Sequence, residues 1–317
     1  MTGTPSGNTE VRSRRGRRIL RILAGLGILF LAALLLLVGG WIYYHPEVQR
    51  EDGIVYGSRH GHDLTYDVLR PTRTNGLGVV VMVSGGWRSS APGSFPLPLA
   101  APLLRRGYTV IPIYHVSQPE STIREIFQDM ARGVRSVRRD ASRIGIDPER
   151  IGCTGGSAGG HLGLMLATRG GPGNPSAADP VDRFSSAVQA VAVFYPVTDL
   201  IDLGPSTENL HDGGPPKSFV KAFRADPDGP ADWKGIGTSL SPLHLLSSNR
   251  PPTLIYHGDA DTLVPIDQSQ RYVQEARRLG NVVELVVHAG GKHGWPTMVF
   301  DLERFADWFD RHLRPGS

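Results

Sequence analysis

The stretch IGCTGGSAGGH, residues 151–161, decides the fold because it places Ser157 in a Gly-x-Ser-x-Gly motif between two predicted elements. Apolar residues before the motif predict a short strand, and residues 162–167 predict a helix. A strand, a sharp turn and a helix form the setting of a nucleophile elbow, whose strained backbone exposes the serine side chain. Gly155, Gly159 and Gly160 supply the small neighbours that such a turn requires. The motif alone is also compatible with an ordinary glycine-rich turn, so the other requirements of a reactive serine have to be sought elsewhere in the chain.

A nucleophilic serine needs a general base within reach and a carboxylate that orients the base. Two later strand patterns, at 252–258 and 282–288, each run into a loop with suitable residues. The first loop carries Asp259 and Asp261, and the second loop, rich in glycine, carries His293. The residues therefore predict His293 as the base and leave both aspartates open as the acid. Asp199, after another strand pattern, is a third candidate acid whose alternative role is to cap a helix.

Backbone N–H groups that stabilise an oxyanion are a further requirement. The apolar strand pattern at 78–83 leads into Gly85, Gly86 and Trp87, where small residues let the backbone approach a substrate oxygen closely. We predict that these three residues and Ala158, which follows the serine, form an oxyanion hole. The alternative interpretation of the Gly-Gly pair is a simple turn.

From residue 79 onward the chain resembles the α/β-hydrolase esterases of the hormone-sensitive-lipase-like and feruloyl- or acetyl-xylan-esterase-like kind. The resemblance rests on six motifs in the same order, at residues 83–87, 105–110, 145–151, 155–159, 257–265 and 291–295. It implies a triad of Ser157, Asp261 and His293, which favours Asp261 over Asp259 as the acid. The family usually carries His-Gly-Gly where this chain has Ser84 followed by two glycines, a difference that bears on loop geometry and substrate preference.

The order of the remaining patterns predicts a mostly parallel central sheet with helices on both faces. Strand patterns at 64–69, 79–83, 109–114, 151–153, 190–194 and the two late strands alternate with helix patterns at 97–106, 123–144, 268–279 and 299–313. We therefore expect one α/β-hydrolase domain over residues 46–317. The segment 203–240, rich in glycine, proline and aspartate, is interpreted as an insertion or lid over the site, in which Phe219, Phe223 and Trp233 are candidates to line an acyl or aromatic pocket. The alternative interpretation is a surface excursion that these aromatic residues anchor.

An uncharged stretch at 22–44 is long enough to span a bilayer as a helix. The leader at 1–21 contains six arginines and one acid, Glu10. The positive-inside rule then predicts a cytoplasmic N-terminus, a transmembrane anchor in contact with lipid, and an extracytoplasmic hydrolase domain. The alternative is a signal peptide whose cleavage releases a secreted domain.

The charge of the whole chain is explained by this leader. The leader carries +5 and the whole chain +4, so the remainder carries about −1. No basic patch with interleaved aromatic residues appears in the body of the chain, which argues against a nucleic-acid partner. Cys153 is the single cysteine, so an internal disulfide and a cysteine-based metal site are excluded.

Together these features predict a membrane-anchored serine hydrolase that cleaves small or medium acyl esters, requires no metal or organic cofactor and takes a small-molecule ester as its substrate. Two other interpretations remain open. An amidase or peptidase would use the same triad, and an inactive hydrolase domain would serve as a binding module.

Overall fold

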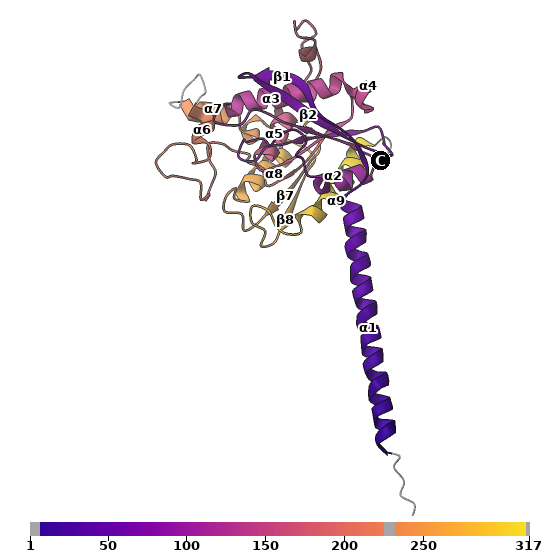
Figure 1. Cartoon of the computed structure of the whole chain (residues 1–317). Helices are drawn as coiled ribbons and strands as arrows, with labels where there is room; N and C mark the ends of the chain where they lie inside the picture. Colours follow the sequence, from indigo (N-terminus) through magenta and orange to yellow (C-terminus); the bar gives the residue numbers. More distant parts are fainter. Residues whose placement is uncertain (1–6, 225–231, 315–317) are drawn as a thin grey trace, which may run out of the picture. The chain divides into compact units, whose positions relative to one another are not determined.

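The computed structural model describes residues 7–224 and 232–314, and the chain divides into two compact units, Met1–Pro46 and Glu47–Ser317. The first unit contains helix α1 (Gly7–Tyr44) (Figure 1). Its segment Gly25–Tyr44 is long and apolar enough to cross a membrane, and this segment lies within the uncharged stretch at 22–44. A signal sequence near the N-terminus meets the same criterion of length and composition.

The second unit is organised around one sheet, which within the described residues has eight strands in the order β1-β2-β4-β3-β5-β6-β7-β8. The strands are β1 (Val48–Arg59), β2 (His62–Pro71), β3 (Gly78–Met82), β4 (Thr109–Ile113), β5 (Ile151–Gly156), β6 (Ala190–Phe194), β7 (Thr253–Gly258) and β8 (Val283–His288). The pairings among β3 to β8 are parallel, whereas β1 with β2 and β2 with β4 are antiparallel. The predicted α/β fold with a mostly parallel sheet is confirmed.

Helices cover both faces of this sheet (Figure 1). The helices of the second unit are α2 (Leu97–Arg105), α3 (Ile123–Arg139), α4 (Ala141–Ile144), α5 (Ala158–Arg169), α6 (Val220–Arg224), α7 (Trp233–Ser239), α8 (Asp267–Arg278) and α9 (Met298–Leu313). Side chains of a strand alternate between the two faces. In β3, accordingly, Val80 and Met82 join the hydrophobic cluster under α3, α5 and α8, while Val79 and Val81 join the cluster under α2 and α9.

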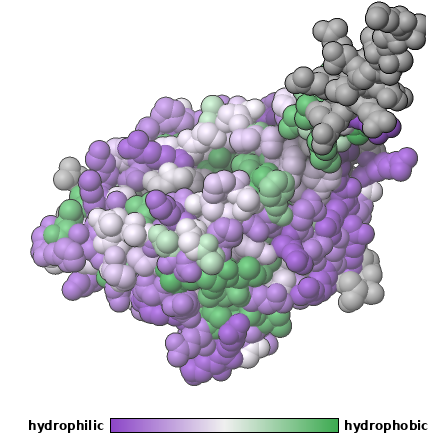
Figure 2. Space-filling model, turned by 90° about the horizontal axis from the view of Figure 1, so that it is seen from below, coloured by the Kyte–Doolittle hydropathy of each residue, from purple (hydrophilic) through white to green (hydrophobic). Residues whose placement is uncertain are grey.

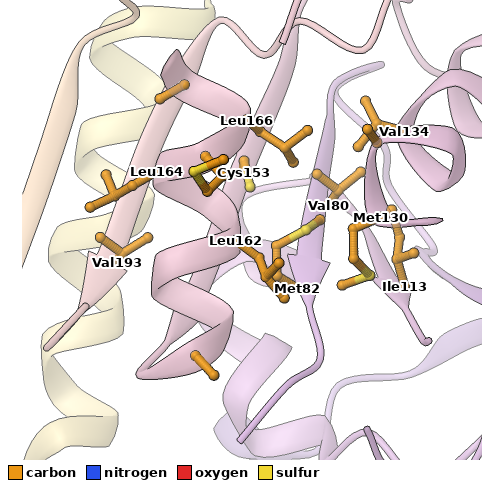
Figure 3. Close-up of a cluster of buried hydrophobic side chains, with 14 of the residues drawn as sticks. Val80, Met82, Ile113, Met130, Val134, Cys153, Leu162, Leu164, Leu166 and Val193 are labelled. Atoms are coloured by element: carbon orange, nitrogen blue, oxygen red, sulfur yellow. The ribbon is translucent and has the colours of Figure 1, made fainter. Parts of the chain in front are cut away.

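Figure 3 shows part of the first cluster, where Cys153 of β5 lies among Leu162 and Leu166 of α5 and Val193 of β6. Cys153 is fully buried, and burial raises the pKa of its thiol above the ordinary value. It therefore acts as a small apolar core residue. Figure 2 shows one side of the molecule, seen from below, where hydrophobic residues form separate green patches within a mostly hydrophilic surface.

Two elements differ from the sequence-based expectation. Strand β1 was not predicted, because only Tyr56 of its twelve residues is buried and an edge strand of this kind lacks a clear alternation of apolar and polar residues. The single helix expected at 123–144 is divided into α3 and α4. The chain leaves helical geometry at Asp140, whose carboxylate accepts hydrogen bonds from Tyr66 and Arg139, both at 2.6 Å.

Candidate active site

Ser157 lies in the turn between β5 and α5, with φ +54° and ψ −121°. A positive φ is unfavourable for a residue that has a Cβ atom, so the surrounding backbone has to hold the turn. The N–H of Ser157 donates to the carbonyl of Phe194 at 3.0 Å. The elbow also passes so close to β3 that a Cβ at Gly159 would overlap the carbonyl of Met82. Glycine at position 159 is therefore required for the turn to pack on the sheet.

The structure brings Ser157, His293 and Asp261 together from three loops at the carboxyl ends of β5, β8 and β7. His293 Nε2 lies 2.9 Å from Ser157 Oγ, and His293 Nδ1 lies 2.7 Å from Asp261 Oδ2. A carboxylate only accepts hydrogen bonds, so Nδ1 carries the proton of the neutral ring and Nε2 accepts from the serine hydroxyl. The side chains thus have the connectivity by which a base activates a serine.

Asp261 is held as an ionised carboxylate. Burial raises the pKa of its carboxyl group, but hydrogen bonds from His257 and His293 outweigh burial and hold the pKa well below its ordinary value. The other oxygen, Oδ1, accepts the backbone N–H groups of Leu263 and Val264, each at 3.0 Å. These bonds orient the carboxylate toward His293.

The two alternative acids lie in different surroundings. Asp259 is exposed, and its Oδ1 accepts the N–H of Gly290 at 2.6 Å, which supports the loop that carries His293. Asp199 forms an ion pair of 2.8 Å with Arg271. The structure therefore brings Asp261, and neither of the other two aspartates, into contact with His293.

His161 and His288 have structural contacts. His161 is fully buried below the elbow, where its Nδ1 accepts from the indole of Trp87 at 3.3 Å and its Nε2 donates to the carbonyl of Leu240 at 2.8 Å. His288 stacks on Trp295 with ring centroids 4.6 Å apart. These partners account for both imidazoles without a catalytic role.

The loop after β3 supplies candidate oxyanion donors. The N–H of Gly85 donates to the carbonyl of Arg88 at 2.9 Å, so Gly85 borders the site but its amide is engaged. The N–H groups of Gly86, Trp87 and Ala158 have no hydrogen-bond partner in the part of the chain that the structure describes. These three amides remain available for the predicted oxyanion hole.

Residues after β4 support this loop, and no sequence pattern predicted this role for them. The hydroxyl of Ser84 donates to His115 Nε2 at 3.0 Å. Burial lowers the pKa of His115 to about 4, so the ring is neutral and can accept this bond. Gln118 donates through its side chain to the carbonyl of Gly86 at 2.5 Å and through its backbone to that of Trp87 at 3.0 Å. A histidine from a neighbouring loop therefore contacts the position where the resembled family usually has one.

A cavity of about 510 Å³ holds Ser157 and His293. The segment 203–240 contributes part of its wall, and residues 225–231 of that segment lie outside the described residues. Among the described residues that line the cavity Glu208 is the acidic one, and one of its carboxylate oxygens accepts the N–H of Ser218 at 3.0 Å.

The aromatic residues proposed for an acyl pocket divide into two groups. Phe219 borders the cavity and packs edge-on against Trp87, with ring centroids 4.9 Å apart. Among the residues that the structure describes, Phe223 and Trp233 do not border the cavity, and Phe223 is instead buried between the rings of Phe219 and Trp233. The pocket interpretation is therefore wrong for Phe223 and Trp233, for which the alternative interpretation holds, since they anchor the segment to the core.

We expect the folded domain to lose stability as the pH falls from about 6.5 toward 4. Burial lowers the pKa of His161 and of His115 from 6.5 to about 4. Between these values the unfolded chain binds a proton at each site and the folded chain does not, so stability rises with pH by at most about 1.4 kcal/mol per unit for each histidine. Urea unfolding of the wild type and of His161→Gln at several pH values measures this slope. Equal slopes in the two proteins would contradict the assignment of His161 as a neutral buried imidazole.

Comparison with known proteins gives three kinds of match. A model of the BD-FAE family matches residues 66–275. The chain is 30% identical over 205 residues to Esterase LipQ of Mycobacterium tuberculosis. This match covers 64% of the present chain and 46% of LipQ. It is 28% identical over 232 residues to Probable carboxylic ester hydrolase LipM of the same organism. This second match covers 72% of the present chain and 52% of LipM. The chain thus spans about half the length of the curated relatives that it matches.

Among solved structures, esterase 2 of Thermogutta terrifontis with bound butyrate is similar to this chain. The TM-score is 0.62 and the sequence identity 25%, and the match covers 86% of this chain and 96% of that structure. The architecture around Ser157 therefore has a counterpart among esterases of known structure.

Proposed function

The chain belongs to the BD-FAE family of α/β-hydrolase esterases, and from this premise we propose that it is a membrane-anchored serine hydrolase that cleaves carboxylic esters of small or medium acyl groups. Names of relatives support the type of bond, since LipQ is an esterase and LipM a probable carboxylic ester hydrolase. The butyrate in the structure of Thermogutta terrifontis esterase 2 is in keeping with acyl groups of this size.

In the proposed mechanism the oxygen of Ser157 attacks the ester carbonyl while His293 Nε2 takes the hydroxyl proton. The amides of Gly86, Trp87 and Ala158 stabilise the negative charge that develops on the carbonyl oxygen. His293 then gives its proton to the leaving alcohol, and Asp261 stabilises the imidazolium. A water molecule, activated by the same histidine, hydrolyses the acyl-enzyme and restores Ser157.

The observation that carries this proposal is the continuous hydrogen-bonded chain from Ser157 through His293 to Asp261, at 2.9 and 2.7 Å, in the same cavity as three amides without partners among the described residues. The proposal is supported because a candidate residue is available for each part of acyl transfer, namely the nucleophile, the base, the orienting acid and the oxyanion donors. The cavity volume of about 510 Å³ suits a small-molecule ester, because pockets that bind small molecules usually have volumes of about 300–1,000 Å³.

A matched ester and amide pair tests the proposal. We expect p-nitrophenyl butyrate to be hydrolysed with a kcat/KM at least roughly a thousandfold above that of butyryl p-nitroanilide, because p-nitrophenolate leaves the tetrahedral intermediate far more readily than an anilide does. The rates are measured on the full chain in lipid nanodiscs by release of the chromophore. Comparable rates for the two substrates would favour an amidase, and hydrolysis of neither by a folded protein would favour a binding module.

We further propose that residues 22–44 remain uncleaved and anchor the enzyme, with the arginine-rich leader in the cytoplasm and residues 46–317 outside it. The apolar region is longer than the ~7–15 residues usual in a signal peptide. The full chain should therefore fractionate with membranes at its uncleaved mass, and proteolysis of intact cells should reach the hydrolase domain. Recovery of a shortened soluble protein from the medium would instead establish secretion.

A further inference from the structure

A second cavity, of about 390 Å³, adjoins the one that holds Ser157. The two cavities share four lining residues, Ser84, Gly85, Gly156 and Tyr195, which therefore form the wall between them. We call the second cavity the inner chamber. It takes no part in the mechanism described above.

The inner chamber lies between the sheet and the helices α2 and α9. Leu99 and Leu103 of α2, Leu302 and Phe305 of α9 and Phe194 of β6 all contribute apolar surface to it. The cavity opens to solvent beside Arg88, Ser90 and Leu99, which are exposed, and the lining away from this opening is mostly apolar. An apolar hollow of this volume is therefore suited to an apolar ligand, and its size lies within the range of roughly 300–1,000 Å³ that small-molecule sites occupy.

Tyr195 has the largest side chain in the shared wall. Its ring centroid lies 4.4 Å from that of His293, and a Cβ at Gly156 would lie 3.5 Å from the Tyr195 ring. The phenolic hydroxyl donates to the sulfur of Met298 at 3.5 Å, which within the described residues is the hydrogen bond that holds this side chain. A thioether is a weak acceptor, so the ring is held mainly by its packing against His293 and against Trp295, whose ring centroid lies 6.1 Å away.

We propose that the inner chamber receives the hydrocarbon chain of the ester substrate, which enters it past Tyr195 while the ester carbonyl lies at Ser157. This inference rests on the proposed function and names the part of the substrate that gives affinity. The walls suit an uncharged chain, because Arg88 is the one charged lining residue among those described and it is exposed. Each methylene that enters should raise kcat/KM roughly fourfold until the chamber is full.

The test compares substrates of increasing chain length on the full chain in lipid nanodiscs. One series is p-nitrophenyl esters from acetate to decanoate, and the other is alkyl acetates from ethyl to decyl. Leu103→Phe narrows the chamber from within. Leu99→Trp, at a partly exposed position (37%) on the chamber rim, is a second variant less prone to disturb folding. Val282→Trp is the matched control, because Val282 is exposed and, among the described residues, borders neither cavity.

The measured quantity is the kcat/KM for the longest substrate of a series divided by the kcat/KM for the shortest. In at least one series we expect this ratio to fall tenfold or more in Leu103→Phe and in Leu99→Trp. In Val282→Trp the ratio should stay at the wild-type value. A fall confined to the first series assigns the chamber to the acyl chain, and one confined to the second assigns it to the alcohol. Unchanged ratios in both series, in both chamber variants, would overturn the proposal.

A binding measurement separates this inference from the proposed function. Ser157→Ala protein in nanodiscs is titrated with decanoate by calorimetry, alone and combined with Leu103→Phe. Weaker decanoate binding in the double variant Ser157→Ala, Leu103→Phe supports the proposal that the inner chamber binds the hydrocarbon chain, whether or not the wild type hydrolyses esters. Equal binding counts against the chamber, even when the wild type is an active esterase.

Discussion

Ser157→Ala should lower the kcat for p-nitrophenyl butyrate by about 10⁶-fold, close to removal of the whole triad, because nucleophile and base act as one unit. The residual rate should come from the oxyanion donors and substrate binding alone. A fluorophosphonate probe, which labels only an activated serine, should mark the wild type and leave Ser157→Ala unlabelled. Steady-state kinetics and in-gel fluorescence measure the two effects.

Ser218→Ala provides the matched control for this experiment. Ser218 borders the same cavity, but the hydrogen bonds found for it involve backbone atoms and none reaches His293. Labelling should persist in this variant, and the kcat should remain within a few-fold of the wild type. Labelling that survives in Ser157→Ala would show that another serine reacts and would remove the basis of the proposed mechanism.

Asp261→Asn should lower kcat by about 10⁴-fold with little change in KM, because an amide nitrogen facing His293 favours the wrong tautomer and cannot stabilise the imidazolium. The asparagine oxygen can still accept the N–H groups of Leu263 and Val264, which the carboxylate accepts at 3.0 Å. The loop geometry should therefore persist. Circular dichroism confirms folding, and steady-state kinetics separate kcat from KM.

Asp259→Asn is the matched variant that distinguishes the two aspartates. Asp259 is exposed and accepts the N–H of Gly290 at 2.6 Å, a bond that an asparagine oxygen can replace. We expect less than a tenfold fall in kcat for this variant. A large loss in Asp259→Asn together with a small loss in Asp261→Asn would reverse the assignment of the orienting acid.

Much of the fold was predictable because its signals are local. The apolar run of β6 was predicted at the same residues that the structure gives, 190–194, since a buried strand in a parallel sheet is apolar on both faces. Strand β1 was not predicted, because it lacks such a run of buried apolar residues. It lies at the sheet edge, most of its side chains are solvated, and its pairing with β2 is decided by backbone hydrogen bonds that any sequence can form.

The support of the oxyanion loop was not predictable. His115 and Gln118 follow β4, and their contacts with Ser84 and Gly86 join residues 31 and 32 positions apart. Neither residue belongs to a motif, and a lone histidine after a strand has many other roles. Only the parallel pairing of β3 with β4, which brings the two strand ends side by side, makes the contacts evident.

The sequence by itself determined the elbow at Ser157, the order of the strands from β2 to β8 and the presence of an apolar N-terminal helix, because these depend on backbone geometry and on apolar spacing along short stretches. The tertiary structure decided which aspartate meets His293, which amides stay free at the loop of Gly86 and Trp87, and that an inner chamber lies behind Tyr195. These features arise where the carboxyl ends of separate parallel strands converge. Distances between such distant segments follow from how the whole sheet packs, and no local pattern encodes them.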